Sequence, residues 1–257
     1  RIILDVYGKY GLDFVTKLRG MFAFALQDGK KLVLARDPFG LKPLYMARGD
    51  AGTMYFASEI KSLTFADNIA TFPPGNILAM SNGMLTMKFN QYFSTSGELD
   101  GGGSFDSMAM RLREMLAAIV SRNTRKGEKA GSLLSGGIDS SVVTAHAISS
   151  RGSGEWQTFC VGTPDSEDMA YAAKAAKALG TVHHERVIGE EDVVKVLPSV
   201  IYHLESFDAP LVRSSIANYI AALEAKRYVT ALLCGEGGDE LFAGYSQLHG
   251  MGYISGN

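Results

Sequence analysis

Glycine, serine and aspartate are concentrated in one short stretch, Ser135–Ser141, directly after an apolar run. Glycine has no Cβ, so Gly136 and Gly137 let the backbone turn sharply and bring its N–H groups close to an anion. The helical pattern that follows would add the positive end of its dipole, which favours phosphate. Hydroxyl donors come from Ser135, Ser140 and Ser141. The stretch therefore predicts a phosphate-binding turn.

Asp139 adds a negative charge to this turn. A carboxylate repels a phosphate unless a cation lies between them, and Mg²⁺ is commonly held by one or two carboxylates together with phosphate oxygens. The alternative is structural: the two glycines would end a strand, and Asp139 would cap the helix. The spacing and the lysine of the Walker loop are both absent, and so is the dinucleotide-binding fingerprint.

A second turn of the same kind follows 100 residues later, where Asp239 takes the place that Asp139 has in the first. It comes after another apolar run, and its acidic residues are Glu236, Asp239 and Glu240. If both runs are parallel strands, both turns lie at the same edge of one sheet. The pair favours the functional interpretation: Asp139 and Asp239 would share one or two Mg²⁺ ions and the pyrophosphate end of a nucleotide.

The elements that must position these turns alternate between strand and helix from residue 108 onward. Strand-like runs at Gly131–Ser135, Trp156–Gly162 and Thr181–Val187 are separated by helical patterns, including Met108–Arg122 and Ser140–Ser150. Such alternation is typical of a doubly wound parallel sheet, which binds its ligands beyond the carboxyl ends of the strands.

The part before residue 94 has a different pattern. Short strands with period two flank the turn dipeptides Asp28-Gly29 and Asn82-Gly83, which indicates an antiparallel sheet. Residues 94–107 are rich in glycine, serine and aspartate and have the composition of a linker. The sequence thus predicts two domains, 1–93 and 108–257, joined by the linker 94–107.

The composition limits which partners and which cellular compartment are expected. The 257 residues carry a net charge of −2 with scattered basic residues, so no nucleic-acid or membrane-surface partner is indicated. No apolar stretch approaches the roughly 18 residues of a membrane span, and no signal peptide is visible. Cys160 and Cys234 both fall in apolar, strand-like runs and are expected to be buried, reduced thiols of a cytoplasmic protein.

Several motifs together resemble a known family. The stretch SGGIDSS resembles the signature loop of the ATP pyrophosphatases, and GEGGDELFAGY narrows this to the asparagine synthetase family of the glutamine-hydrolysing type. Supporting stretches are FCVG, LGTVHHE and LESFDAPLVRSS, and in the first part LRGMFAFALQD, ARDPFGLKPLY and FASEIKSL. The resemblance covers nearly the whole chain.

The resemblance implies a two-domain α/β and α+β protein. Residues 1–93 would be the later half of an antiparallel β glutaminase domain of the Ntn hydrolase type. Residues 108–257 would be an ATP pyrophosphatase domain, similar to the adenine nucleotide alpha hydrolases and incomplete at its C-terminus. The implied reaction activates aspartate with ATP to β-aspartyl-AMP, releases pyrophosphate, and forms the amide with ammonia from glutamine.

Roles for individual residues follow from the same resemblance. The pyrophosphate would be held by Ser135, Gly136, Gly137, Asp139 and Ser140, with Asp139 and Asp239 as Mg²⁺ ligands. The adenosine would contact the backbone at Leu133, Val161, Cys234 and Gly235. Arg213 would face the acyl-adenylate, since a guanidinium can pair with a carboxylate or phosphate through two hydrogen bonds, and Glu236 would lie beside the reacting groups.

In the glutaminase part, Asp37 would hold the α-amino group of glutamine. The family's N-terminal cysteine nucleophile is not present in a chain that starts at Arg1. Without this nucleophile we expect no glutaminase activity. The family's C-terminal helical part, which supplies a catalytic lysine there, is also absent, so we expect a fragment. Ala209, Pro210 and Leu211 stand where some members carry hydroxyl residues.

Three other interpretations remain open at this point. A β-lactam synthetase uses the same scaffold with an internal amine in place of ammonia. A thiolating ATP pyrophosphatase acting on tRNA would need a basic surface and cysteines in loops. A non-catalytic nucleotide-binding fragment would bind ATP without releasing pyrophosphate. A homodimer is also possible.

Overall fold

The computed structural model describes residues 2–50, 53–82, 84–93, 103–124, 127–151 and 155–245. The chain divides into two compact units, Arg1–Gly101 and Gly102–Asn257. Each unit is described by itself below. Most of the predicted linker, residues 94–102, lies outside the described residues.

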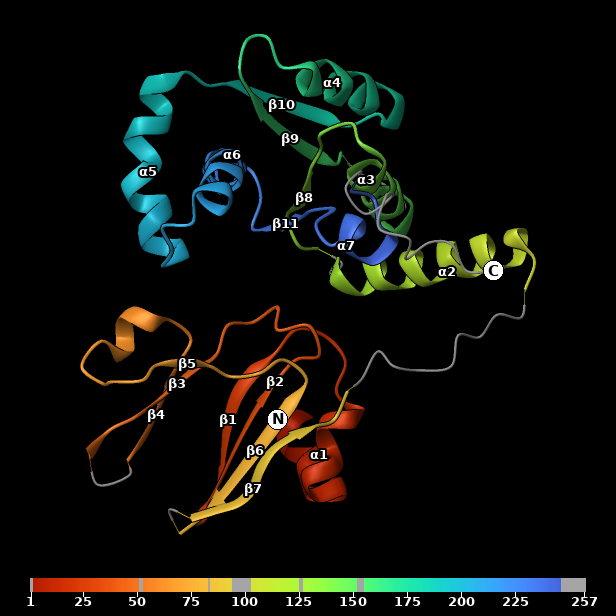
Figure 1. Ribbon diagram of the computed structural model, residues 1–257. Coiled ribbons are helices and arrows are strands. Elements are labelled where there is room, and N and C mark those ends of the chain that lie inside the picture. Colours follow the sequence, from red (N-terminus) through yellow and green to blue (C-terminus); the bar gives the residue numbers. More distant parts are fainter. Residues whose placement is uncertain are drawn as a thin grey trace, which may run out of the picture. The chain divides into compact units, whose positions relative to one another are not determined.

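The first unit is built on two antiparallel sheets (Figure 1). The larger has the strand order β1-β2-β6-β7 and the smaller the order β4-β3-β5. The predicted hairpin is present, since Asp28 pairs with Lys31 across a two-residue turn. The elements are α1 (Ile2–Tyr10), the 3₁₀ helix η1 (Gly11–Lys17), β1 (Ala23–Asp28), β2 (Lys31–Arg36), β3 (Tyr45–Arg48), β4 (Met54–Ala57), the 3₁₀ helix η3 (Ile60–Leu63), β5 (Ala70–Thr71), β6 (Asn76–Ser81) and β7 (Met84–Gln91).

The central strand β2 is buried on both faces. Val33 and Ala35 face one core, where they pack with Phe14 of η1 and with apolar residues of α1. Leu34 points the other way and packs with Leu44 and Phe72. This alternation follows from the period-two geometry of a strand.

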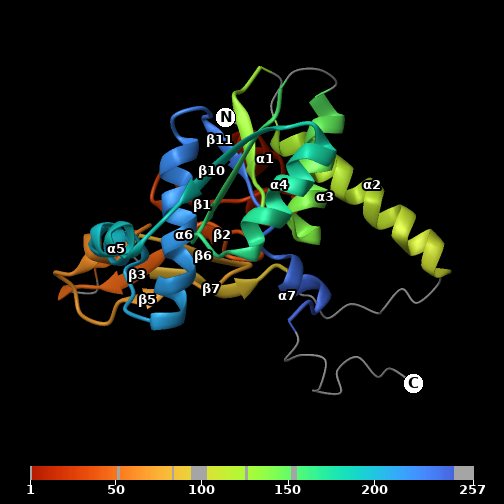
Figure 2. The same ribbon diagram turned by 90° about the horizontal axis from the view of Figure 1, so that it is seen from above.

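The second unit has the predicted parallel sheet, in the order β10-β9-β8-β11. Helices α3 and α4 cover one face and α6 covers the other, with α5 packed on α6 (Figures 1 and 2). The elements are α2 (Phe105–Asn123), β8 (Ala130–Leu133), α3 (Ile138–Arg151), β9 (Gln157–Gly162), α4 (Glu167–Leu179), β10 (Val182–Val187), α5 (Glu190–Leu204), α6 (Ala209–Ala225), β11 (Ala231–Leu233) and α7 (Gly238–Phe242).

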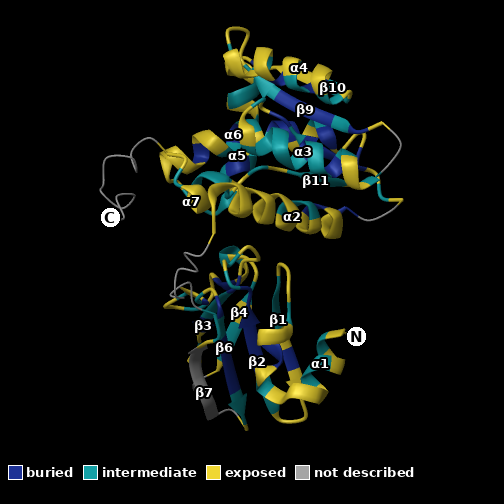
Figure 3. Ribbon diagram, turned by 90° about the vertical axis from the view of Figure 1, so that its right-hand side faces the viewer, coloured by how far each residue is buried: buried dark blue, intermediate teal, exposed yellow. Residues whose placement is uncertain are grey.

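The core of the second unit lies on the two faces of β8 and β9. On one side Ala130 packs with Val120 of α2 and Ala147 of α3. On the other side Phe159 packs with Ala225 and Val229 at the end of α6. Figure 3 shows β9 as largely buried and α2 as largely exposed.

Three sequence predictions need correction. Helix α2 begins at Phe105, three residues before Met108, because Ser104 caps it by accepting the N–H of Ser107. Helix α3 begins at Ile138 rather than at Ser140, which places Asp139 in its first turn. Cys234 is exposed and follows β11, which ends at Leu233, whereas Cys160 is buried in β9 as expected.

Across the described parts of the chain, no helix combines the length and the apolar character that crossing a membrane requires.

Candidate functional site

The two glycine turns lie side by side at the carboxyl edge of the parallel sheet. Strands β8 and β11 are neighbours, and Leu233, the last residue of β11, pairs with Ser132, one residue before the end of β8. The two turns therefore begin at almost the same level of the sheet. This is the arrangement that the repeated turn pattern predicted.

The first turn contains a closed network of hydrogen bonds among its own residues. The hydroxyls of Ser135 and Ser140 are 3.1 Å apart, and the Ser140 hydroxyl also donates to the carbonyl of Gly137 at 3.2 Å. The N–H of Gly137 in turn donates to the Ser135 hydroxyl at 3.3 Å. These contacts hold the turn in one shape before any ligand arrives.

Gly136 is required by the backbone itself. Its φ of 81° lies in the left-handed region, and a Cβ there would stand 2.6 Å from the carbonyl oxygen of Tyr171 in α4. Gly137 has no such restriction, because its nearest neighbour is the Ser135 hydroxyl at 3.4 Å. The backbone conformation and packing therefore require glycine at residue 136 but not at residue 137.

The second turn packs directly on the first. A Cβ on Gly235 would stand 2.8 Å from the N atom of Ser140, and one on Gly238 would stand 2.5 Å from Oδ1 of Asp139. Gly235 is therefore needed for the close approach of the two turns, because its Cβ would meet backbone, whereas a Cβ at residue 238 would displace the Asp139 carboxylate.

One cavity of about 230 Å³ opens between the turns. It gathers most of the residues predicted for the phosphate end of a nucleotide, and it is lined by Leu133, Ser135, Gly137, Asp139, Ser140, Asn218, Cys234, Gly235, Glu236, Gly237, Asp239, Glu240 and Tyr245. A smaller, more apolar cavity of about 100 Å³ adjoins it and shares Leu133, Ser135 and Asn218 with it. Val161 lines this second cavity, next to Cys160 and Ala221.

The larger cavity is strongly acidic. Four carboxylates line it and no Lys or Arg is among its described lining residues. Glu240 accepts a 2.6 Å hydrogen bond from the Tyr245 hydroxyl, and this bond lowers the pKa of Glu240. The same bond is the largest cause that raises the pKa of Tyr245, to about 12, so its hydroxyl remains a donor. A free polyphosphate would be repelled by this lining.

The donor set suits Mg²⁺ bound together with a phosphate ligand. Carboxylate oxygens are the ligands that Mg²⁺ prefers, and it typically takes only one or two of them beside water and phosphate oxygens. Among the described residues no three Asp, Glu, His or Cys side chains come together as a ready-made metal cage. The carboxylates of Asp139 and Asp239 in one cavity fit a metal that arrives with the nucleotide.

Two predicted residues lie elsewhere. Arg213 is exposed on α6 and lines neither cavity, although it precedes the lining residue Ala217 by one helical turn. Asp37 is in the first unit and is buried, with only 1% of its surface exposed.

The carboxylate of Asp37 is already occupied. Oδ1 accepts the N–H groups of Phe39 and Leu41, and Oδ2 accepts those of Phe22 and Lys42. A carboxylate offers about four lone-pair positions, so these four donors use them. Asp37 anchors the loop 37–42 here, and a contact with the amino group of glutamine would have to displace these bonds.

Three residues that line the larger cavity were not singled out from the sequence. Gly237 and Tyr245 belong to the motif GEGGDELFAGY, so the motif itself contained the signal, and Glu240 of the same motif was named only as an acidic residue. Asn218 gave no motif signal, but it is an isolated amide in the otherwise apolar stretch Ile216–Ala222.

Comparisons with known proteins identify the family of the chain. The family model "Asparagine synthase" matches residues 111–256, and the model "Glutamine amidotransferase domain" matches residues 1–65. The chain is 35% identical to asparagine synthetase [glutamine-hydrolyzing] 2 of Oryza sativa subsp. japonica, over 96% of this chain and 43% of the rice protein. It is 33% identical to asparagine synthetase B [glutamine-hydrolyzing] of Escherichia coli K12, over 96% of this chain and 47% of that protein.

The chain therefore spans less than half the length of these relatives. Among solved structures, an NH₃-dependent NAD synthetase from Campylobacter jejuni covers 53% of this chain and 60% of its own, with 13% identity and a TM-score of 0.37. That likeness is too weak to support an argument about the fold or the site.

Proposed function

The chain belongs to the asparagine synthase family, and we propose that it contains the ATP-activating site of a glutamine-hydrolysing asparagine synthetase. The observation that supports this most is the joining of two glycine turns, from adjacent parallel strands, around one acidic cavity. A nucleotide phosphate chain and its cation fit that combination of N–H donors and carboxylates.

In the proposed reaction the side-chain carboxylate of aspartate attacks the α-phosphorus of ATP. The bond from the α-phosphorus to the bridging oxygen breaks, pyrophosphate leaves, and β-aspartyl-AMP remains. Ammonia then attacks the acyl carbon and AMP leaves with the carboxylate oxygen. The matched amidotransferase domain at residues 1–65 is consistent with glutamine as the source of that ammonia.

Residues of both turns have a role in the proposed reaction. Backbone N–H groups near Gly137, with the hydroxyls of Ser135 and Ser140, would hold the leaving pyrophosphate. Mg²⁺ would be held by Asp139 and Asp239, and when bound it neutralises phosphate charge and so favours pyrophosphate departure. The adenine would enter the apolar cavity beside Leu133 and Val161.

The test is pyrophosphate release from ATP, measured on the protein together with whatever sequence flanks these residues in its gene. Each amino acid is supplied in turn with Mg²⁺, and Asp139→Asn is the control. We expect release that depends on aspartate and fails in the variant. Release with a different carboxylate would assign a sister activity on the same scaffold, and ATP binding without release would contradict the synthetase proposal.

Two finer features belong to the same proposal. A cytoplasmic location fits the free thiols Cys160 and Cys234, and a fluorescent fusion would test it. A homodimer would be tested by light scattering on the purified protein, where a single monomer mass at micromolar concentration would contradict it.

A further inference from the structure

We propose that Asn218 is a positioning residue that hydrogen-bonds a ribose hydroxyl of the bound nucleotide. The inference rests on the proposed function, because it takes ATP as the ligand of the two cavities. It concerns a residue that neither glycine turn contains and that the motifs do not mark.

Asn218 lies where the two cavities meet. Only three described residues line both of them, and the other two are Leu133 and Ser135 on the strand side. Asn218 comes from the opposite wall, helix α6, where Val212, Ile216 and Ile220 are buried and Asn218 is exposed. The junction is therefore bounded by a sheet edge on one side and by this amide on the other.

The chemistry of the two cavities sets the orientation of a nucleotide. The apolar cavity, with Leu133, Val161 and Ala221, suits the flat base. The acidic cavity between the glycine turns suits the phosphates and their metal. The sugar joins base and phosphates, so in this orientation it occupies the junction beside Asn218.

The amide of Asn218 needs a partner once a ligand arrives. No hydrogen bond to its side chain is found among the described residues, and its neighbour Ala217 and the following Ala221 offer none. While the junction is open, water satisfies the amide. A ligand that fills the junction excludes this water, and an unpaired amide in a closed site costs binding free energy. The ribose hydroxyls can both donate and accept, which meets the need of a carboxamide with two donors and one acceptor oxygen.

The inference predicts selectivity for ribonucleotides that depends on Asn218. The dissociation constants of ATP, 2′-deoxyATP and 3′-deoxyATP are measured by calorimetry with Mg²⁺ on the wild type and on Asn218→Leu, which keeps the shape and removes the amide. Ser214→Ala is the control on the same helix, one turn away and outside both cavities. Thermal unfolding checks that each variant is folded.

We expect the wild type to bind ATP about 3- to 10-fold more tightly than one of the two deoxynucleotides, the range of one neutral hydrogen bond. Asn218→Leu should weaken ATP binding by about the same factor and abolish that preference, while Ser214→Ala should keep it. If Asn218→Leu binds ATP with the wild-type preference over the two deoxynucleotides, or if the wild type binds ATP and both deoxynucleotides equally well, the role of Asn218 is refuted and the nucleotide site stands. If the wild type binds no ATP, the proposed function fails and this inference fails with it.

Discussion

The carboxylate of Asp139 lies directly against Gly238, although 99 residues separate them in the chain. Any Cβ at residue 238 would stand 2.5 Å from Oδ1 of Asp139, closer than real Cβ contacts allow. Because residue 238 has no side chain, the Asp139 carboxylate of the first turn can occupy its position. The two turns therefore contact each other directly, in addition to lining the same cavity.

Gly238→Ala should therefore damage the nucleotide site more than the fold. The added methyl group must push the Asp139 carboxylate away from its position in the cavity. We expect Mg·ATP affinity to fall by at least about 10-fold, which corresponds to about 1.4 kcal/mol. Gly189→Ala is the matched control, because a Cβ there meets nothing within 4 Å. Equal ATP affinities of Gly238→Ala and the wild type would refute the proposed position of Asp139.

The two adjacent glycines of the first turn should respond differently to the same substitution. Gly136→Ala places a Cβ against the backbone of α4 at a left-handed φ, so we expect it to lower the free energy of unfolding by more than about 2 kcal/mol. Gly137→Ala meets only the Ser135 hydroxyl at contact distance and should cost less than about 1 kcal/mol. Trp156, the single tryptophan, is buried in the second unit and reports the unfolding by fluorescence. A similar decrease in the free energy of unfolding for Gly136→Ala and Gly137→Ala would contradict this distinction.

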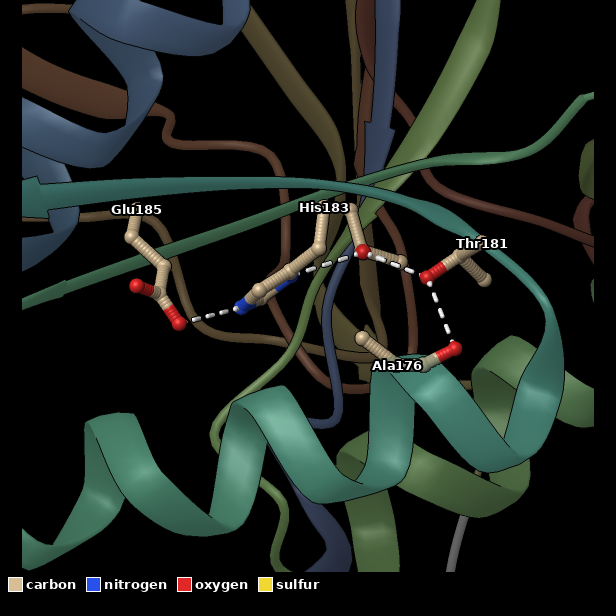
Figure 4. A network of polar contacts seen from close by, with 5 residues as sticks. Ala176, Thr181, His183 and Glu185 are labelled. Carbon is tan, nitrogen blue, oxygen red and sulfur yellow. Dashed lines mark hydrogen bonds and ion pairs between the residues drawn. The ribbon is translucent and has the colours of Figure 1, made fainter.

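The acid sensitivity of the second unit should depend on His183. Its ring belongs to a chain of contacts with Thr158, Thr181 and Glu185, and Figure 4 shows this chain with His183, Thr181 and Glu185 labelled. The Thr181 hydroxyl donates to the carbonyl of Ala176, so Thr158 donates to Thr181 and Nδ1–H of His183 donates to Thr158. In the neutral ring Nε2 is then bare, buried and without a hydrogen bond, 3.6 Å from Oε1 of Glu185.

Burial is the largest effect and lowers the pKa of His183 below 6.5, against the opposing effect of Glu185, which raises it. The unfolded chain therefore binds a proton more readily than the folded one, and this part of the stability is present above pH 6.5 and lost as the pH falls through the folded pKa. His183→Asn keeps a donor toward Thr158 without titrating, so its urea midpoint should fall less than that of the wild type between pH 7.5 and 5.5. An identical decline in both proteins would show that His183 is not responsible.

Removing the carboxylate of Asp37 should loosen the loop 37–42 of the first unit. Asp37→Ala leaves four backbone N–H groups without their acceptor, and unpaired buried donors cost about 1–3 kcal/mol each before relaxation. We expect amide hydrogen exchange at Leu41 and Lys42 to accelerate by more than about 100-fold. Asp28→Ala, which removes only an exposed bond from the Tyr7 hydroxyl, should leave this exchange unchanged. Slow exchange in Asp37→Ala would mean that the loop is held by other contacts.

Much of the fold was accessible from the sequence because local patterns reported it directly. Helix–strand alternation after residue 108 predicted the parallel sheet. The repeated glycine turns predicted the edge at which the acidic cavity lies, since the carboxyl ends of parallel strands meet at one edge of a sheet. The first residues of helices α2 and α3 were predicted less accurately. Ser104 and the glycine turn set the true starts of α2 and α3 through capping and backbone geometry, which apolar periodicity does not record.

What the sequence did not predict depends on contacts that are visible only in the folded chain. Cys234 follows an apolar run, but β11 ends one residue earlier and leaves it exposed at the cavity. The role of Asp37 toward glutamine stays a prediction, and the sequence did not indicate that its carboxylate accepts four backbone N–H groups from residues 22–42. Asn218 lines the cavity from helix α6, outside both glycine turns, and nothing local in the sequence distinguishes it from a surface amide.

The central claim is that the two turns form one site for a metal-bound nucleotide, and calorimetry tests it most directly. ATP is titrated into the wild type and into Asp139→Asn, each with Mg²⁺ and with EDTA. The account predicts binding by the wild type that requires Mg²⁺, and at least about 10-fold weaker binding by Asp139→Asn under the same conditions. Equal affinity of the two proteins for ATP, with or without Mg²⁺, would contradict it.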